Sequence, residues 1–240
     1  MAPKGRVVAL ADDIRSRGHW WIVIAPADHV EGRLPYRELE ATVAKAKVQL
    51  RGWDFPHLDR PGSIRRRMSS IAQETDWNYY REIWEFFQTG QFTYLIGIHE
   101  DWTERSLGWG PPPHLVEQGR LLGIGDALFR LTETLAFASR LSQTSAGGNE
   151  IHTRIEIHGL RDRRLWVDSP SRMPFDGQYV TDVETYVFED TIDRQELIAN
   201  FRSIAVDQAL ELYARFGWNP TRELVEGQQG ELRGVSLLSR

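Results

Sequence analysis

The residues from 151 to 158 alternate strictly between two kinds of side chain, and no other feature constrains the fold of the chain as much. Isoleucine and threonine occupy the odd positions, whereas the even positions hold His152, Arg154, Glu156 and His158. Successive side chains of a strand point to opposite faces of a sheet, so this period of two predicts a strand with one buried and one solvated face. Burial on one face only is typical of antiparallel sheets.

Apolar and β-branched runs that are too short for stable helices predict the remaining strands. The densest of them is HWWIVIA at residues 19–25, which predicts a buried strand. A short strand or extended corner is expected at Gln49–Pro56. Further strands are predicted at Ser69–Thr75, Gln91–His99, Leu165–Val167 and Tyr179–Glu189.

Apolar side chains three and four residues apart predict the helices. The predicted helices are Arg6–Arg17, Pro35–Val48, Asp76–Phe87, His114–Leu141 and Asp193–Phe216, followed by a short helix in the C-terminal tail. Asp193 and Glu196 form a capping-box pattern at the start of the last long helix. For the stretch after Asp76, a hairpin that turns at Thr89-Gly90 is the alternative to a helix.

This order of elements favours the α+β class, with a mixed, largely antiparallel sheet covered by several long helices. The chain has 240 residues, which is an ordinary length for one domain. We therefore expect a single globular domain over residues 1–240. A sub-boundary near residues 143–149, the clearest internal linker, stays open.

Cysteine content and net charge exclude several classes of function. Without cysteine, the chain has no disulfides, no thiolate catalysis and no cysteine-ligated metal. A net charge of −5 disfavours a broadly basic nucleic-acid binder, although a local basic patch is compatible with it. No apolar stretch reaches the ~20 residues of a membrane span, and the N-terminal apolar run is short for a signal peptide. We expect a cytoplasmic protein without a membrane partner.

Motifs that identify common enzymes are missing from the sequence. It contains no phosphate-binding loop, dinucleotide-binding fingerprint, zinc-protease motif or nucleophile elbow. The only lysines are Lys4, Lys45 and Lys47, and none lies beside an acidic cluster. We therefore expect no cofactor and no metal. Whether the chain is an enzyme stays open, and a non-enzymatic role is favoured.

Three polar residues, His99, Glu100 and Asp101, lie at the end of the predicted strand 91–99, where ligands and catalytic groups often project. Histidine and carboxylates suit several divalent metal ions. The alternative is a polar loop that opens after a core strand, because adjacent side chains point in different directions and make poor joint ligands. All three are candidate catalytic residues.

The solvated face of the strand at 151–158 carries a second candidate set, which comprises His152, Glu156 and His158. Histidine can act as a general base near neutral pH, and a nearby carboxylate would orient it. A solvated strand face without catalytic function is the alternative interpretation.

Two loops are rich in arginine. The first carries Arg60, Arg65, Arg66 and Arg67, and the second carries Arg161, Arg163 and Arg164. If these loops meet in space, their guanidinium groups could hold phosphates. Trp53 and Phe55 lie close enough in the sequence to the first loop to stack on a base. Solvated turns balanced by Asp59 and Asp162 are the alternative.

The segments Leu50–His57 (LRGWDFPH) and Trp84–Phe92 (WEFFQTGQF) resemble blocks of bacterial proteins that carry a Schlafen-type, AlbA-like DNA-binding and divergent ATP-binding domain. In that family a strand like Ile155–Leu160 ends in a Gly-Leu turn before an arginine, and a serine stands where this chain has Thr89. The resemblance covers about Leu50–Leu165. It implies a bacterial regulatory or antiviral-defence context, with the DNA- or ATP-handling part absent here or on another chain, and it transfers no catalytic residue.

Three functional hypotheses follow. The first is a non-catalytic binding, adaptor or sensor domain with a protein partner. The second is a metal- or histidine-dependent hydrolase or nuclease acting on nucleic acid or a nucleotide, which requires a candidate histidine to converge with an acidic residue. The acidic residues considered are Asp54, Asp76 and Asp101. The third hypothesis is a nucleic-acid binder that uses the two arginine loops, and self-association stays open.

Overall fold

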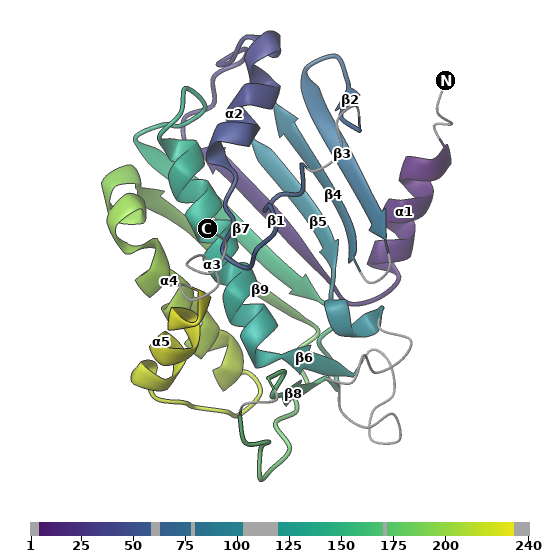
Figure 1. Cartoon of the computed structure of the whole chain (residues 1–240), viewed down its shortest axis with the longest axis vertical. Helices are drawn as coiled ribbons and strands as arrows, with labels where there is room; N and C mark the ends of the chain where they lie inside the picture. The colour runs from purple at the N-terminus through teal and green to yellow at the C-terminus, as the bar shows by residue number, and fades with distance from the viewer. Residues whose placement is uncertain (1–4, 59–62, 78–79, 103–119, 170–171, 233–240) are drawn as a thin grey trace.

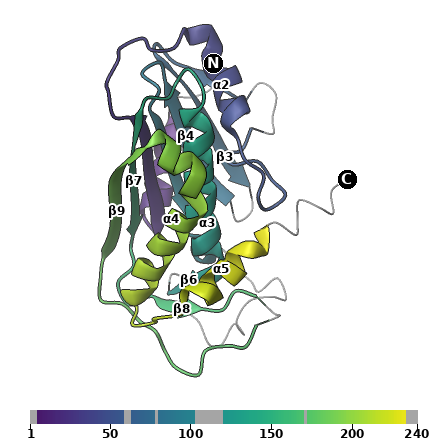
Figure 2. The ribbon, with the colours of Figure 1, turned by 90° about the vertical axis from the view of Figure 1, so that its left-hand side faces the viewer.

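The computed structural model of the chain describes residues 5–58, 63–77, 80–102, 120–169 and 172–232. In these residues seven strands form one sheet in the order β2-β3-β4-β5-β1-β7-β9. All neighbouring strands of this sheet run antiparallel, and the long helices α3 and α4 cover one of its faces (Figures 1 and 2). The predicted α+β class with a largely antiparallel sheet is therefore confirmed.

The strands of the large sheet have the following bounds: β1 His19–Pro26, β2 Arg65–Arg66, β3 Ser70–Trp77, β4 Tyr80–Phe87, β5 Phe92–Gly97, β7 Glu150–His158 and β9 Thr185–Asp193. Two short strands, β6 (Leu121–Gly123) and β8 (Arg164–Trp166), pair in parallel outside this sheet. In β7 the odd-numbered side chains from 151 to 157 are buried and the even-numbered ones are half-buried. The alternation of the sequence therefore predicted both the strand and its buried face.

The helices are α1 Gly5–Arg15, α2 Leu39–Ala46, α3 Ile124–Ser142, α4 Arg194–Ala214 and α5 Arg222–Gly230, with 3-10 turns η1 at Tyr36–Glu38 and η2 at His99–Asp101. Helix α1 packs on the opposite face of the sheet from α3, where Leu10 and Ile14 form a small cluster with Leu95. Asp193 caps α4 as predicted, because its carboxylate accepts the backbone N–H groups of Gln195 and Glu196. None of the helices in the described ranges is long and apolar enough to cross a membrane.

The helix predicted at 76–87 is wrong, because this stretch forms the end of β3 and the whole of β4. The alternative hairpin is confirmed: β4 and β5 are antiparallel neighbours joined at Thr89-Gly90. Gly90 has a φ of 87°, which residues with a Cβ rarely adopt. The aromatic spacing misled because it fits two periods. Trp84 and Tyr80 are four residues apart and also lie on one face of a strand.

The long helix predicted at 114–141 is wrong at its beginning. Residues 114–119 lie outside the described ranges, and Leu121–Gly123 forms β6, so α3 begins only at Ile124. The strand predicted at 179–189 is displaced, because β9 runs from Thr185 to Asp193. The linker at 143–149 joins α3 to β7, and β7 pairs with β1 in the same sheet. Strands from both sides of the linker therefore share one sheet.

Candidate functional site

The chain between α2 and β2 turns a corner, and two side chains of this corner, Arg51 and Trp53, lie over the first turns of α3. Val48 and Phe55 pair with each other through their backbones, with N–O distances of 3.0 and 2.9 Å. This pairing folds residues 49–54 into a projecting loop, from which Arg51 reaches α3. Trp53, at the tip of the loop, is 37% exposed. The extended corner predicted at 49–56 is where the site begins.

Arg51 holds two carboxylates of α3. Its Nε and Nη2 atoms donate to the two oxygens of Glu133 at 3.0 and 2.7 Å, and its Nη1 donates to Asp126. Arg130 lies beside the same network, with its Nη1 3.8 Å from Glu133. Burial alone would lower the pKa of Arg51, but Glu133 and Asp126 raise it well above its usual value. Such a buried ion pair is costly to break, because either partner would be left without a counter-charge.

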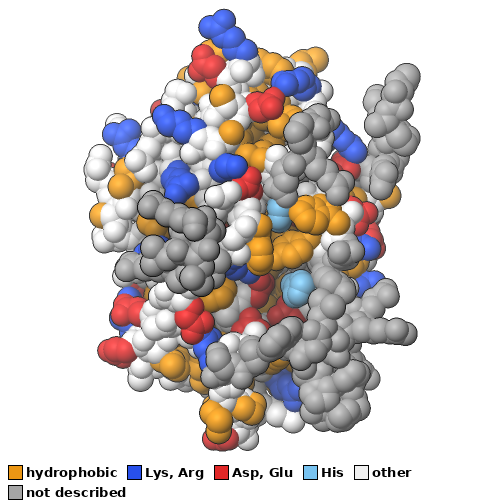
Figure 3. Space-filling view, viewed as in Figure 1, with side chains coloured by type: hydrophobic (Ala, Val, Ile, Leu, Met, Phe, Trp, Pro, Cys, Tyr) orange, Lys and Arg blue, Asp and Glu red, His pale blue; other side chains and the backbone are white. Residues whose placement is uncertain are grey.

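Aromatic rings lie beside this network, where Trp53 is exposed, Tyr80 and His99 are half-buried and His57 is buried. The Trp53 ring packs edge-on against Tyr80, with centroids 5.7 Å apart, and the Arg51 guanidinium lies 5.2 Å from the Trp53 ring. Tyr80 in turn lies 5.6 Å from the His57 ring and 5.8 Å from the His99 ring. Hydrophobic and histidine side chains gather near the middle of the face that α3 covers (Figure 3). We call Arg51, Trp53, Tyr80, His99 and Asp126 the aromatic–charge site.

Carboxyl groups surround the N-terminus of α3 below these rings. Glu100 accepts the backbone N–H of Gly123 at 2.7 Å and the indole N–H of Trp166 at 3.2 Å. Asp168 accepts the N–H groups of Gly125 and Asp126 at 2.9 and 2.7 Å. A Cβ atom on Gly123 would lie 2.6 Å from Glu100 Oε1 and 2.5 Å from Asp168 Oδ2. Gly123 must therefore be glycine for both carboxyl groups to approach the same backbone.

The surroundings shift the pKa values of the Glu100 and Asp126 carboxyl groups in opposite directions. Burial, followed by the charges of Asp126 and Asp168, raises the pKa of Glu100 to about 8. Burial opposes ionisation of Asp126 as well, but Arg51 and Arg130 outweigh it and lower the pKa of Asp126 to about 2. At neutral pH Glu100 is therefore protonated while Asp126 is ionised. Opposite shifts in neighbouring carboxyl groups are typical of acid–base sites.

The three residues predicted at the end of β5 do not act together. His99 belongs to the aromatic–charge site, where it contacts Tyr80, whereas Glu100 lies below it at the N-terminus of α3. Asp101 instead points into the protein, where it binds Arg163 at 2.7 Å and the N–H of Gly18 at 2.8 Å. Adjacent side chains diverge in this way because η2 is a single tight turn.

The second predicted set lies on the opposite face of the sheet. His158 Nε2 contacts Glu156 Oε2 at 2.7 Å, and the His158 ring stacks on His19 with centroids 4.7 Å apart. His152 lies 3.6 Å from Glu189. The even-numbered side chains of β7 point away from α3, so this set does not join the aromatic–charge site.

The acidic residues of the hydrolase hypothesis bind other partners. Asp54 pairs with Lys47 at 2.7 Å, and Asp76 lies 3.4 Å from Arg81. Neither contact includes a histidine. The acidic residue that His99 does influence is Asp126, whose ionised form it favours.

The two arginine loops do not meet in the described part of the chain. Arg65, Arg66 and Arg67 pair with Glu74, Glu40 and Glu85 at 2.6, 2.8 and 2.9 Å. Arg163 is buried against Asp101, and Arg164 lies in β8, far from β2 (Figure 1). Arg60 lies outside the described residues. The carboxylate partners of Arg65, Arg66 and Arg67 neutralise the charge of the first loop. The described residues of the two loops therefore do not form a shared phosphate site.

Several residues of the site carried no functional prediction. Arg51 stands inside the block LRGWDFPH, and no role was predicted for it. Trp53 was predicted to stack on a base beside the first arginine loop, and the structure places it beside Arg51 instead. Asp126 could have been noticed from its place after Gly123-x-Gly125, but no local pattern marked Asp168, which reaches α3 from beyond β8.

Comparison of the chain with protein-family models, with curated proteins and with solved structures finds no match. The resemblance of the two sequence blocks therefore stays a prediction. In the described residues, no group of three or more histidine, aspartate or glutamate side chains could hold a metal ion.

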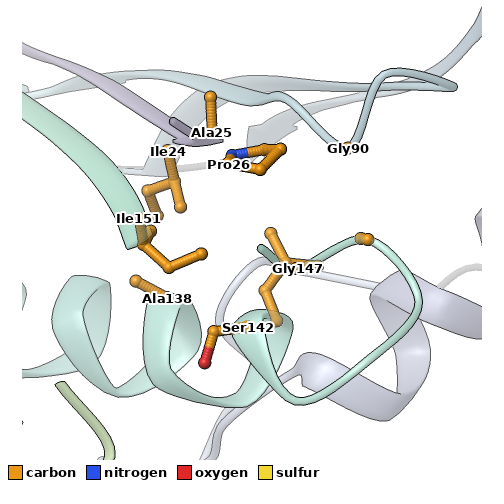
Figure 4. Close-up of a pocket in the computed structure, with 10 residues that line it drawn as sticks. Ile24, Ala25, Pro26, Gly90, Ala138, Ser142, Gly147 and Ile151 are labelled. Atoms are coloured by element: carbon orange, nitrogen blue, oxygen red, sulfur yellow. The ribbon is translucent and has the colours of Figure 1, made fainter. Parts of the chain in front are cut away.

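An apolar indentation lies at the other end of the sheet, between β1, α3 and the segment after α3. It is too narrow to hold a water molecule, and its walls include Ile24, Ala138 and Ile151 (Figure 4). The hydroxyl of Ser142, also in its wall, donates to the carbonyl of Ser139 at 2.7 Å. The indentation offers little to a polar ligand, so the aromatic–charge site is the better candidate.

Proposed function

We propose that this chain is a non-catalytic binding domain, of the adaptor or sensor kind, whose partner docks on the aromatic–charge site. The observation that carries this proposal is the exposed Trp53 ring, held between Tyr80 and the Arg51 guanidinium. Tryptophan, tyrosine and arginine are the residue types that contribute most often to the affinity of protein interfaces. A protein is therefore the expected partner, and the bacterial regulatory or antiviral context rests on the sequence resemblance alone.

The pairing of the charged groups favours binding over catalysis. Arg51 engages the carboxylates of both Asp126 and Glu133, and Asp168 caps the helix. A general base needs a lone pair that can reach the substrate, and these three carboxylates instead accept hydrogen bonds from Arg51 or from the backbone of α3. The exposed part of the site is the Trp53 ring, which lies beside the ion-paired guanidinium of Arg51.

Replacement of Trp53 with alanine is expected to weaken partner binding by at least about 2 kcal/mol, or roughly 30-fold. The partner would first be isolated on the wild-type chain, and its affinity for both chains measured by titration calorimetry. Leu224→Ala is the matched control, because Leu224 is an exposed apolar side chain on α5. Equal affinities of wild type and Trp53→Ala for the partner would reject this site.

A second candidate function is acid–base hydrolysis of a nucleotide or nucleic acid, and the opposite pKa shifts of Glu100 and Asp126 favour it. In this function the protonated Glu100 would donate a proton to the leaving group. Activity should then fall as pH rises through about 8, where Glu100 loses its proton.

Glu100→Gln separates the two candidate functions. For a hydrolase, it should lower the rate on nucleotides and single-stranded nucleic acid by at least about 100-fold. For a binding domain, the wild-type chain should release no product, and Glu100→Gln should bind the partner as the wild type does. Product formation that is equal in both chains would point to a contaminating enzyme.

A further inference from the structure

Strand β9 forms one edge of the large sheet and directs alternate backbone groups outward. The carbonyl of Glu150 accepts the N–H of Ala27, which follows β1, so even-numbered residues of β7 face β1. Odd-numbered residues of β7 therefore face β9 and pair with its even-numbered residues. The N–H and C=O groups of Thr185, Val187 and Glu189 consequently point away from the sheet.

No described strand or helix pairs with this outer edge. Figure 2 looks onto it: β9 is the outermost strand, and α4 lies to one side of it. The opposite edge is different, because β2 is only two residues long. A nine-residue edge strand with outward N–H and C=O groups is a template for a further strand. Near the C-terminal end of β9, the N–H of Thr191 already donates to the carboxylate of Asp190 at 2.8 Å, so it is not available to a further strand.

The side chains beside this edge favour a basic, partly apolar strand. Val187 is 46% exposed, and its neighbours on the strand and its flanks include the carboxylates of Glu184, Glu189 and Asp190. Glu184 and Glu189 pair with arginines of the protein, but both remain about half exposed. Exposed pairs of this kind are weak, so a lysine or arginine of an added strand can share these carboxylates.

We propose that the outer edge of β9 is a docking site for an extended, basic segment of a partner protein, which adds to the sheet as a further strand. The N–H groups of Val187 and Glu189 then donate to the backbone of that segment, an apolar side chain covers Val187, and cationic side chains lie next to Glu184 and Glu189. A second copy of this chain would instead bring like charges together. This surface is separate from the aromatic–charge site, so the inference goes beyond the proposed function.

Amide hydrogen exchange of the full chain tests this docking site with two synthetic peptides as long as β9. In the basic peptide a valine has a lysine two residues before it and a lysine three residues after it, with threonine elsewhere, so that in an antiparallel pairing these three side chains lie opposite Glu189, Val187 and Glu184. The acidic peptide has glutamate in place of both lysines. The basic peptide is expected to slow exchange at Val187 and Glu189 by at least about tenfold, and the acidic peptide is expected to leave both amides unchanged. Equal protection by both peptides, or by neither, would overturn the proposal. Protection that rises with protein concentration alone would assign the edge to a second copy.

Two variants keep this test decisive. Val187→Pro removes an outward N–H that the pairing with β7 does not use, so it should abolish binding of the basic peptide while Tyr186 and Phe188 stay protected. Val187→Thr, which keeps the N–H, is the control. Glu189→Lys leaves the backbone intact and should shift the preference toward the acidic peptide. Full binding of the basic peptide to a folded Val187→Pro chain, or an unchanged preference in Glu189→Lys, would contradict the docking site.

Discussion

Replacement of Asp101 with alanine is expected to destabilise the chain by about 3–5 kcal/mol, the usual cost of breaking a buried ion pair. The side chains of Asp101 and Arg163 are 1% and 2% exposed. Asp101 binds this arginine through both carboxylate oxygens and also accepts the N–H of Gly18. Loss of the carboxylate therefore leaves a buried guanidinium without a counter-charge.

Arg163 has little room to escape to solvent. A Cβ atom on Gly18 would lie 2.0 Å from its Nη2, which shows how closely the chain surrounds the guanidinium. Its remaining donors bind the carbonyl groups of Gly159 and Leu121 at 2.6 and 2.9 Å. The pair therefore fixes η2, the turn after β7 and the start of β6 to one another, and so positions His99 and Glu100.

Urea unfolding followed by circular dichroism at neutral pH measures this effect. Asp12→Ala is the control, because Asp12 is exposed on α1, and it should change the free energy of unfolding by no more than about 0.5 kcal/mol. Combining Asp101→Leu with Arg163→Met should recover much of the lost stability, since both buried charges are then removed. A loss below about 1 kcal/mol in Asp101→Ala would show that the pair is not buried as described.

Glu100→Gln is expected to stabilise the folded chain, by on the order of 3 kcal/mol at pH 7. Burial and the neighbouring carboxylates raise the pKa of Glu100 from 4.5 to about 8. Between these two values the folded state binds more protons than the unfolded state, so Glu100 makes the free energy of unfolding fall as pH rises. Glutamine keeps an oxygen for the N–H of Gly123 and cannot ionise.

The pH dependence of unfolding distinguishes this effect from a simple change in packing. The stability of the wild type relative to Glu100→Gln should fall steadily from about pH 4.5 to pH 8 and level off above it. Glu226→Gln, an exposed change on α5, is the control and should leave the wild-type dependence unchanged. Parallel pH profiles for wild type and Glu100→Gln would mean that Glu100 is ionised in the folded chain.

Local sequence patterns predicted the elements whose formation depends mainly on residues close together in the sequence. The alternation at 151–158 identified β7 and its buried face, and Asp193 identified the start of α4. At 76–87 the aromatic spacing suited both a helix and a strand, and pairing with β3 and β5 decided for the strand. Both partner strands adjoin this stretch in the sequence, but the spacing of the aromatic residues inside the stretch does not include them.

The candidate site was predictable only in part, because its residues come from segments far apart in the sequence. His99 and Glu100 were found because they follow a strong strand signal. Asp126 and Arg51 are 75 residues apart in the sequence, and only the packing of the corner on α3 brings them together. The same packing gives Asp126 and Glu100 their opposite pKa shifts, which depend on burial and neighbouring charges.

Fluorine NMR of the chain labelled with fluorotryptophan tests the proposed binding site most directly. Trp53→Phe assigns the Trp53 signal, and Trp84, which is fully buried, serves as the internal reference. As the isolated partner is added, the Trp53 signal should move or broaden in proportion to the bound fraction while the Trp84 signal stays in place. A Trp53 signal that remains unchanged at saturation would contradict binding at the aromatic–charge site.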